Sequence, residues 1–337
     1  MLASPAIADK TLHPVDLWSP RERSRLMADM TQGTARAGSV GAGPSFAQLD
    51  QRRWHFQHGP IDLILQVEGE QSVVQQALAD SWAHFQSVLP QLAAELNELR
   101  RPVGEQPCLH GTVAARMLQA CVPFAFERFI TSMAAVAGAV ADELIELFKR
   151  RGIVRASINN GGDIALHLTS GQRYRIGICA NVGEPSPSPS AGRTALDSSF
   201  VIVADTPARG VATSGWRGRS FSLGIADSVT VLAANAAGAD AAATLIANAV
   251  NCEHEEIVRR PANQLKDDTD LAGRLVTVHV PPLPSALIAE ALERGRCEGD
   301  HWRRRGLIYA AALFLQGQVA LVLPPGEGVL LQAASQR

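Results

Sequence analysis

Residues 157–166 read SINNGGDIAL, and this stretch decides how the middle of the chain folds. It joins two short segments of alternating apolar residues through Asn-Asn-Gly-Gly at 159–162, and an acid, Asp163, follows directly. Paired Asn and Gly residues supply the positive φ angles of a tight β-hairpin. A hairpin therefore explains the glycines, but it leaves the carboxylate of Asp163 without a purpose.

The segments on either side of this hairpin alternate between strand and helix patterns. Apolar residues alternate over 61–67 and predict a strand, whereas an apolar period of three to four residues over 72–99 predicts a helix that is bent or restarted at Pro90. A second helical pattern covers 129–150, where small Ala and Gly side chains let another backbone approach closely. Further strands are predicted at 153–159, 164–168, 174–180, 200–205, 228–233, 276–280, 306–316 and 317–325, and further helices at 238–250 and after 281–285.

This order of elements defines the expected fold class. Adjacent strands of hairpin type, interspersed with helices, favour an α+β fold with a mostly antiparallel sheet. Residues 1–50 are rich in Ala, Ser, Gly and Pro, and they predict a loosely ordered N-terminal arm. Residues 51–330 predict one domain, in which the Pro-Ser stretch at 184–192 forms a flexible loop.

Composition and charge exclude several classes of partner. The chain has 337 residues, and its 46% hydrophobic content is ample for a buried core. A net charge of -2 provides no field to attract nucleic acid or an anionic membrane, and no run of apolar residues is long enough to span a bilayer. The five cysteines are scattered without CxxC spacing, and the first residues lack the pattern of a secretory signal, so we expect a cytoplasmic location.

The first of three short motifs with chemical potential is the hairpin turn itself. Gly161 and Gly162 lack Cβ atoms, so a ligand could lie against their peptide groups, while Asp163 could accept hydrogen bonds from a ribose hydroxyl or a ring N–H. The alternative is a plain hairpin with a solvated acid.

The second motif is Ala-Thr-Ser-Gly at 212–215. The hydroxyls of Thr213 and Ser214 and the flexible Gly215 could hold a phosphate, or they could form an ordinary Ser/Thr turn. Both interpretations stay open from these residues alone.

The third motif is the helix start GADAAAT at 238–244. Asp240 and Thr244 are four residues apart, so a helix places their oxygens on one face, one turn apart. One carboxylate and one hydroxyl suit a Mg²⁺ ion that keeps several waters and is completed by substrate phosphates. The alternative is an ordinary helix cap.

Taken together and in order, these motifs resemble those of the ApbE superfamily of flavin transferases. AVAGAVADEL, INNGGDIAL, VATSG and SVTVLAANAAGADAAAT carry the resemblance across about residues 54–250. The runs HFQHGPIDLILQVEG and ITSMAAVAGAVADE are more similar to its uncharacterised ApbE-like branch. The resemblance implies an α+β fold with a variant T-fold core and a cleft that holds FAD. It also implies Mg²⁺ on the FAD pyrophosphate and transfer of FMN to a hydroxyl of an acceptor protein.

The same resemblance implies roles for individual residues. Asn160, Gly161, Gly162 and Asp163 would approach the flavin nucleotide, Thr213, Ser214 and Gly215 would line the same cleft, and Asp240 and Thr244 would ligate Mg²⁺.

One departure from that superfamily limits the comparison. Between TSG and SVTV the transferases carry paired histidines, whereas this chain has WRGRSFSLGIAD at 216–227, so no catalytic residue is assigned. His55 and His58 are the histidines that could substitute for the missing base in space.

Two classes of function therefore remain. As an enzyme, the chain would cleave FAD with Mg²⁺ and transfer or release FMN. As a binding protein, it would hold a flavin, a pterin or a related heterocyclic nucleotide without turnover. A third hypothesis is an assembly role, including homo-oligomers, in which the small-residue helix packs against a partner.

Overall fold

The computed structural model describes residues 43–104, 108–178, 198–324 and 330–333. Residues 1–42 of the predicted arm and the Pro-Ser stretch lie outside this part of the chain. The strands are β1 Ser45–Gln48, β2 Arg53–His58, β3 Ile61–Gly69, β4 Ile153–Asn160, β5 Asp163–Leu168, β6 Arg173–Ile178, β7 Ser198–Val203, β8 Gly210–Ser214, β9 Ser228–Ala233, β10 Val258–Pro261, β11 Leu275–His279, β12 Ala310–Leu315, β13 Gln318–Val322 and β14 Leu330–Ala333. The helices are α2 Gln71–Ala94, α3 Leu96–Leu99, α4 Thr112–Ala125, α5 Val136–Ile145, α6 Ala236–Ala249, α7 Ala262–Leu265 and α8 Ser285–Arg304, with 3-10 turns η2 Ser132–Ala135 and η3 Glu146–Phe148.

A nine-stranded sheet forms the centre of the molecule. Its strands lie in the order β1-β2-β3-β4-β5-β8-β9-β12-β13, and every neighbouring pair is antiparallel. The predicted α+β fold with a mostly antiparallel sheet is therefore confirmed. The finer assignment to a variant T-fold stays a prediction.

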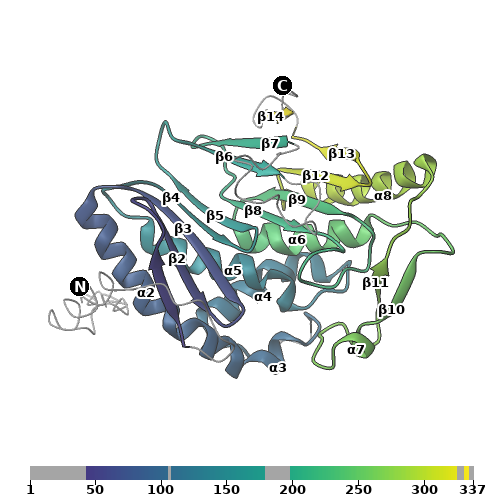
Figure 1. The fold of residues 1–337 in the computed structure, drawn as a ribbon, viewed down its shortest axis with the longest axis horizontal. Helices are drawn as coiled ribbons and strands as arrows, with labels where there is room; N and C mark the ends of the chain where they lie inside the picture. Colours follow the sequence, from purple (N-terminus) through teal and green to yellow (C-terminus); the bar gives the residue numbers. More distant parts are fainter. Residues whose placement is uncertain (1–42, 105–107, 179–197, 325–329, 334–337) are drawn as a thin grey trace, which may run out of the picture.

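Two apolar cores lie on the two faces of this sheet. Helices α2, α5, α6 and α8 cover one face, with α4 packed against α5 and α6, and the larger core lies between them and the strands (Figure 1). The small sheet β14-β7-β6 covers the other face over a second core. Along β5, Ile164 and Leu166 pack into the second core and Ala165 into the first, so strand alternation turns Asp163 toward the helices.

The N-terminal part of the sheet starts earlier than predicted. Strand β1 lies within the range assigned to the loosely ordered arm, and it pairs with β2 along its whole length. The rings of Phe46 and Phe56 are 5.6 Å apart, which explains why this short polar-flanked segment joins the sheet.

Two helical predictions need correction. The segment 129–150 contains only a ten-residue α-helix, α5, which lies between two 3-10 turns. An apolar residue at every third position is compatible with both an α-helix and a 3-10 helix, so the pattern could not distinguish them. Helix α4 was not predicted, although Val113, Met117, Cys121 and Phe124 form a buried stripe at helical spacing. Helix α2 continues through Pro90 to Ala94.

Candidate functional site

The predicted hairpin joins β4 to β5 through a two-residue turn. Asn160 pairs with Asp163, and the φ angles of Gly161 and Gly162 between them are +66° and +121°. The N–H of Gly162 donates to the side-chain oxygen of Asn159 at 2.8 Å. The turn conformation therefore accounts for both glycines.

Asn160 ties this turn to the helix layer. Its side-chain N–H donates to the carbonyl oxygen of Ala137 at 3.1 Å, at the start of α5. Asn160 is buried, so this amide holds the hairpin against α5.

Asp163 is not a solvated turn residue. Its side chain is only 8% exposed, and its Oδ1 accepts a hydrogen bond from the N–H of Thr213 in β8 at 3.2 Å. Burial raises the pKa of Asp163 to about 7. A buried carboxyl group that accepts so few hydrogen bonds is more stable in its protonated form, or with a cation bound beside it.

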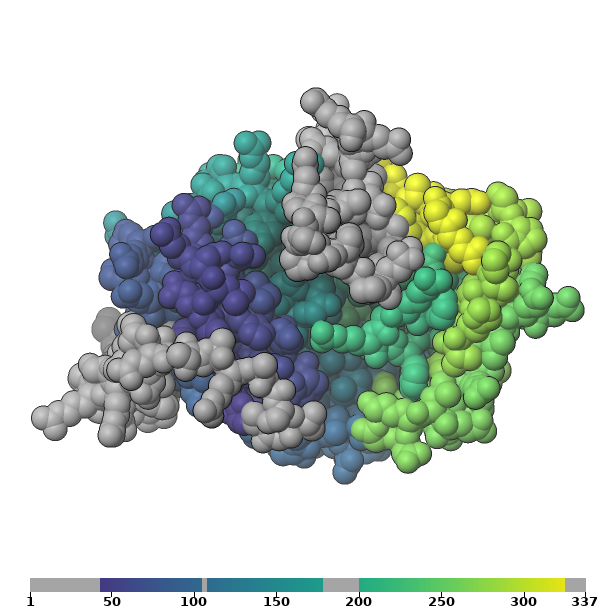
Figure 2. All heavy atoms as spheres, in the orientation of Figure 1, coloured from purple at the N-terminus to yellow at the C-terminus, as the bar shows by residue number. Residues whose placement is uncertain are grey.

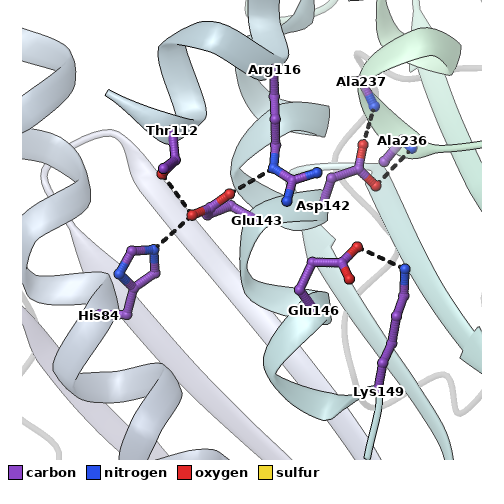
Figure 3. Close-up of polar contacts among 9 residues, drawn as sticks. All are labelled: His84, Thr112, Arg116, Asp142, Glu143, Glu146, Lys149, Ala236 and Ala237. Carbon is purple, nitrogen blue, oxygen red and sulfur yellow. Dashed lines mark hydrogen bonds and ion pairs between the residues drawn. The ribbon is translucent and has the colours of Figure 1, made fainter. Parts of the chain in front are cut away.

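Asp240 does not cap the helix to which it belongs. Its Oδ2 accepts the N–H of Gly138 at 3.0 Å, at the start of α5. In the opposite direction, Asp142 of α5 accepts hydrogen bonds from the N–H groups of Ala236 and Ala237 at the start of α6, at 2.9 and 2.7 Å (Figure 3). The two helices therefore cap each other.

The start of α6 consequently offers little to an external anion. Asn235 accepts the N–H of Gly238 through its side chain at 2.7 Å, and Asp142 occupies the two N–H groups between them. A phosphate would have to displace a protein side chain to bind there.

Asp163 and Asp240 form what we call the acid pair. Burial and then the charge of Asp163 raise the pKa of Asp240 well above its ordinary value. Burial and then the charge of Asp240 likewise raise the pKa of the Cys121 thiol in α4. Residues from β5, α6 and α4 therefore approach one place on the helix side of the sheet.

The 212–215 motif divides between the two faces of the sheet. The hydroxyl of Thr213 lies 2.9 Å from the hydroxyl of Thr230, on the face of the small sheet, so only the backbone N–H of Thr213 reaches the acid pair. Strand alternation turns the next residue, Ser214, toward the helices. A Cβ on Gly215 would lie 2.3 Å from the carbonyl oxygen of Asp227, so this glycine is required by packing.

Thr244 extends the site along α6. It follows Asp240 by four residues, which places both side chains on one helix face about 6 Å apart, and both are partly exposed. Asn248 comes next on this face and accepts the N–H of Leu223 at 2.8 Å. The segment 216–227, which we call the arginine loop, therefore runs beside the same face.

The histidines considered as a replacement base lie away from the acid pair. His55 pairs with Asp62 at 2.9 Å, and the ring of His58 packs edge-on against Phe85. Both histidines are in β2, three strands from β5, which corresponds to about 14 Å. Direct proton transfer between either histidine and the acid pair is therefore excluded in this arrangement.

The surface is hollowed on the face shown in Figure 2, where a recess lies between the purple N-terminal strands and the green C-terminal elements. A separate cavity of about 1560 Å³ is lined by residues that include Val67, Ile153 and His167. It lies at the other end of β4, about 23 Å from the turn along the strand.

Comparison with known proteins places the chain in a family. The model of the family described as AbpE bacteria matches residues 46–321. The chain belongs to this family.

Relatives of this family member come from archaea and are called UPF0280 proteins. The relative from Methanoculleus marisnigri is 29% identical over 68% of this chain and 93% of its own length. The relative from Methanopyrus kandleri is 32% identical over 56% of this chain and 76% of its own length. The relative from Methanocorpusculum labreanum is 36% identical over 41% of this chain and 55% of its own length. These names specify no reaction, so the chemistry of this AbpE family member must be argued from its site.

The motifs identified both acids of the pair but missed two neighbours. Asp142 was overlooked although it is an acid on the small-residue side of α5, where burial indicates a hydrogen-bond partner. Arg219 belongs to the segment 216–227 that replaces the paired histidines, and sequence spacing gave no sign that it lies over Gly161.

Proposed function

We propose that the chain binds a flavin nucleotide, FAD or a close relative, together with Mg²⁺ beside the acid pair. In this proposal it cleaves FAD and transfers FMN to an acceptor protein or releases it. The convergence of two carboxylates from β5 and α6, each with a raised pKa, is the observation that carries the proposal. A cytoplasmic location stays a prediction; within the described residues no helix is long and apolar enough to cross a membrane.

The donor set near the acid pair fits Mg²⁺ better than a caged ion. The described residues contain no group of three or more His, Cys, Asp or Glu side chains that could hold a metal, which excludes a closed protein cage there. Asp163 and Asp240 supply two carboxylates, and Thr244 supplies a hydroxyl one turn further along α6. Mg²⁺ commonly uses one or two carboxylates and completes its shell with water and phosphate oxygens.

The surroundings of the acid pair suit a phosphate-containing ligand. Bound Mg²⁺ would neutralise negative charge on the phosphate oxygens. Asp163 and Asp240 would hold the ion, since its charge offsets the repulsion between two neighbouring carboxylates, of which Asp163 is buried. The turn at Gly161 and Gly162 would leave room for the ligand against the backbone.

The arginine loop favours a second candidate function. It contains Arg217 and Arg219 and no histidine, and its acid, Asp227, accepts N–H groups of Trp216 and Gln316, so the loop offers positive charge but no unengaged base. A protein that holds a flavin, a pterin or a related heterocyclic nucleotide without turnover is consistent with this composition.

Release of AMP distinguishes these two functions. Purified chain is incubated with FAD and MgCl₂, AMP is measured by chromatography, and binding is followed by flavin fluorescence. Asp240→Asn keeps an oxygen that can accept from Gly138 and removes the charge, while Asp62→Asn, at a half-buried residue in β3 that pairs with His55, is the control.

AMP release that Asp240→Asn abolishes and Asp62→Asn leaves intact supports the enzyme. Flavin binding without AMP supports the binding protein. Absence of flavin binding, with or without Mg²⁺, contradicts the enzyme and restricts the binding protein to a ligand other than a flavin.

A further inference from the structure

Arg219 of the arginine loop lies directly over the hairpin turn. Its Nη1 is 3.3 Å from the position that a Cβ on Gly161 would occupy, and its side chain is exposed. Within the described residues no acid forms an ion pair with Arg219. The guanidinium group is therefore positioned beside the turn, and none of the described acids occupies its hydrogen-bond donors.

Arg217, the other arginine of the loop, is engaged with the protein. Its Nε is 3.9 Å from Oδ1 of Asp227, and its guanidinium group lies 4.9 Å from the ring centre of Trp216. The two arginines therefore differ in role although they are two residues apart, and Arg217 serves as the matched comparison for Arg219.

The base of the arginine loop is fixed by backbone and side-chain bonds. The N–H of Trp216 donates to the carbonyl oxygen of Ala226 at 3.0 Å, and its indole N–H donates to Asp227 at 3.3 Å. Asp227 also accepts the N–H of Gln316 at 2.6 Å, which anchors the loop to the end of β12. These contacts hold the backbone near Arg219 without using the guanidinium group.

Among the described residues, Arg219 is the one that contacts the space above the turn. Within this part of the chain, a Cβ on Gly162 would meet no atom within 4 Å, and a Cβ on Gly161 would meet only the guanidinium group. An anion could therefore lie above this turn against Arg219, on one side of the site, while the acid pair holds a cation on the other.

We infer that Arg219 binds a phosphate group of the ligand and thereby selects nucleotides that carry a diphosphate over flavins or pterins that do not. This inference rests on the proposed function, because it takes the acid pair as the cation site. A diphosphate carries enough negative charge to bridge a bound divalent cation and a guanidinium group, whereas riboflavin carries none. Arginine suits the role because its planar group can donate two parallel hydrogen bonds to phosphate oxygens.

Affinity measurements on three flavins test the inference. FAD, FMN and riboflavin are titrated by fluorescence in the presence of Mg²⁺ against wild type, Arg219→Gln, Arg219→Lys and Arg217→Gln. We expect Arg219→Gln to weaken FAD binding about 10- to 100-fold and riboflavin binding hardly at all, with partial recovery in Arg219→Lys. Arg217→Gln should bind FAD nearly as the wild type does.

A second pair of variants tests whether an added methyl group in a turn weakens FAD binding through contact with Arg219 or through backbone strain. Gly161→Ala would press a methyl group against Arg219, whereas Gly171→Ala, in a turn with φ +77° and no atom within 4 Å of the added group, imposes backbone strain alone. Only Gly161→Ala should weaken FAD binding.

The outcomes distinguish this inference from the proposed function. Tight FAD binding that Arg219→Gln leaves unchanged overturns the inference and leaves the flavin function standing. Failure of the wild type to bind any flavin, combined with Arg219-dependent binding of ADP with Mg²⁺, retains the diphosphate site and rejects the flavin function. Failure to bind either ligand rejects both.

Discussion

Replacing Asp163 with Asn should stabilise the chain at neutral pH, although the residue lies in the candidate site. The substituted amide keeps an oxygen that can accept the N–H of Thr213, so the shape of the turn is preserved. Burial is the larger cause of the raised pKa of Asp240, and the substitution removes the second cause, the negative charge of Asp163. A functional carboxylate retained at a cost in stability is a common property of binding sites.

The size of the effect follows from the pKa of Asp163. Below about pH 3.8, its unperturbed value, the carboxyl group is protonated in both the folded and the unfolded chain, and the substitution should change little. As the pH rises toward about 7, ionisation favours the unfolded chain, so the wild type loses stability and the variant does not. A displacement from 3.8 to about 7 corresponds to at most about 4 kcal/mol at pH 7 and above.

Urea denaturation at pH 4, 6 and 8 measures this difference. We expect the free energy of unfolding of Asp163→Asn to exceed that of the wild type at pH 8 and to approach it at pH 4. The control is Asp80→Asn, because Asp80 is buried but paired with Arg150 at 2.9 Å, and its loss should destabilise the chain. Saturating Mg²⁺ should stabilise the wild type more than Asp163→Asn. A variant less stable than the wild type at pH 8 would refute the reasoning.

Three further predictions concern the scaffold around the acid pair. Asp142→Ala leaves two N–H groups at the start of α6 without their acceptor and should lower the free energy of unfolding by about 2 kcal/mol in urea denaturation; an unchanged value would contradict the mutual capping of α5 and α6. Gly138→Ala places a methyl group 2.3 Å from the carbonyl oxygen of Ala236 and should cost about 1–3 kcal/mol or prevent folding, which soluble yield and melting temperature would reveal; a variant as stable as the wild type would mean that the helices can separate. Glu143→Gln should lower the free energy of unfolding by at most about 3 kcal/mol above pH 4.5, since the pKa of Glu143 is lowered from 4.5 to about 2. The loss should shrink as the pH falls toward 2, which urea denaturation at several pH values would measure. A loss that is independent of pH would contradict the charge-based origin.

Much of the fold was predictable because its signals are local. The turn at Gly161 and Gly162 follows from the need for positive φ angles, and the strands around it follow from alternation. The mutual capping of α5 and α6 was not predictable, because it joins Asp142 to a helix start 94 residues further along the chain. Local patterns carry no information on such pairs.

The candidate site was predictable in its residue types but not in its orientations. The motif at 212–215 suggested that both hydroxyls would line one cleft, yet strand alternation separates Thr213 from Ser214 across the sheet. Gly215 was interpreted as ligand-facing, but its missing side chain is explained by contact with Asp227. A single strand motif cannot place adjacent side chains on the same face, so one of the two hydroxyls had to point away.

Glu143 and Asp163 show how structural and functional acids differ in this molecule. Although burial opposes ionisation, side-chain hydrogen bonds from His84, Thr112 and Arg116 lower the pKa of Glu143 to about 2, and the charged group joins α2, α4 and α5 (Figure 3). Asp163 is more fully buried than Glu143, yet its carboxyl group accepts one backbone N–H. Glu143 therefore has the hydrogen-bond donors that stabilise its charged form, whereas Asp163 does not. The cost of burying a charged Asp163 must be offset by a proton or by a bound cation. The acid pair, and not the more extensive Glu143 network, is therefore the better candidate for a binding site.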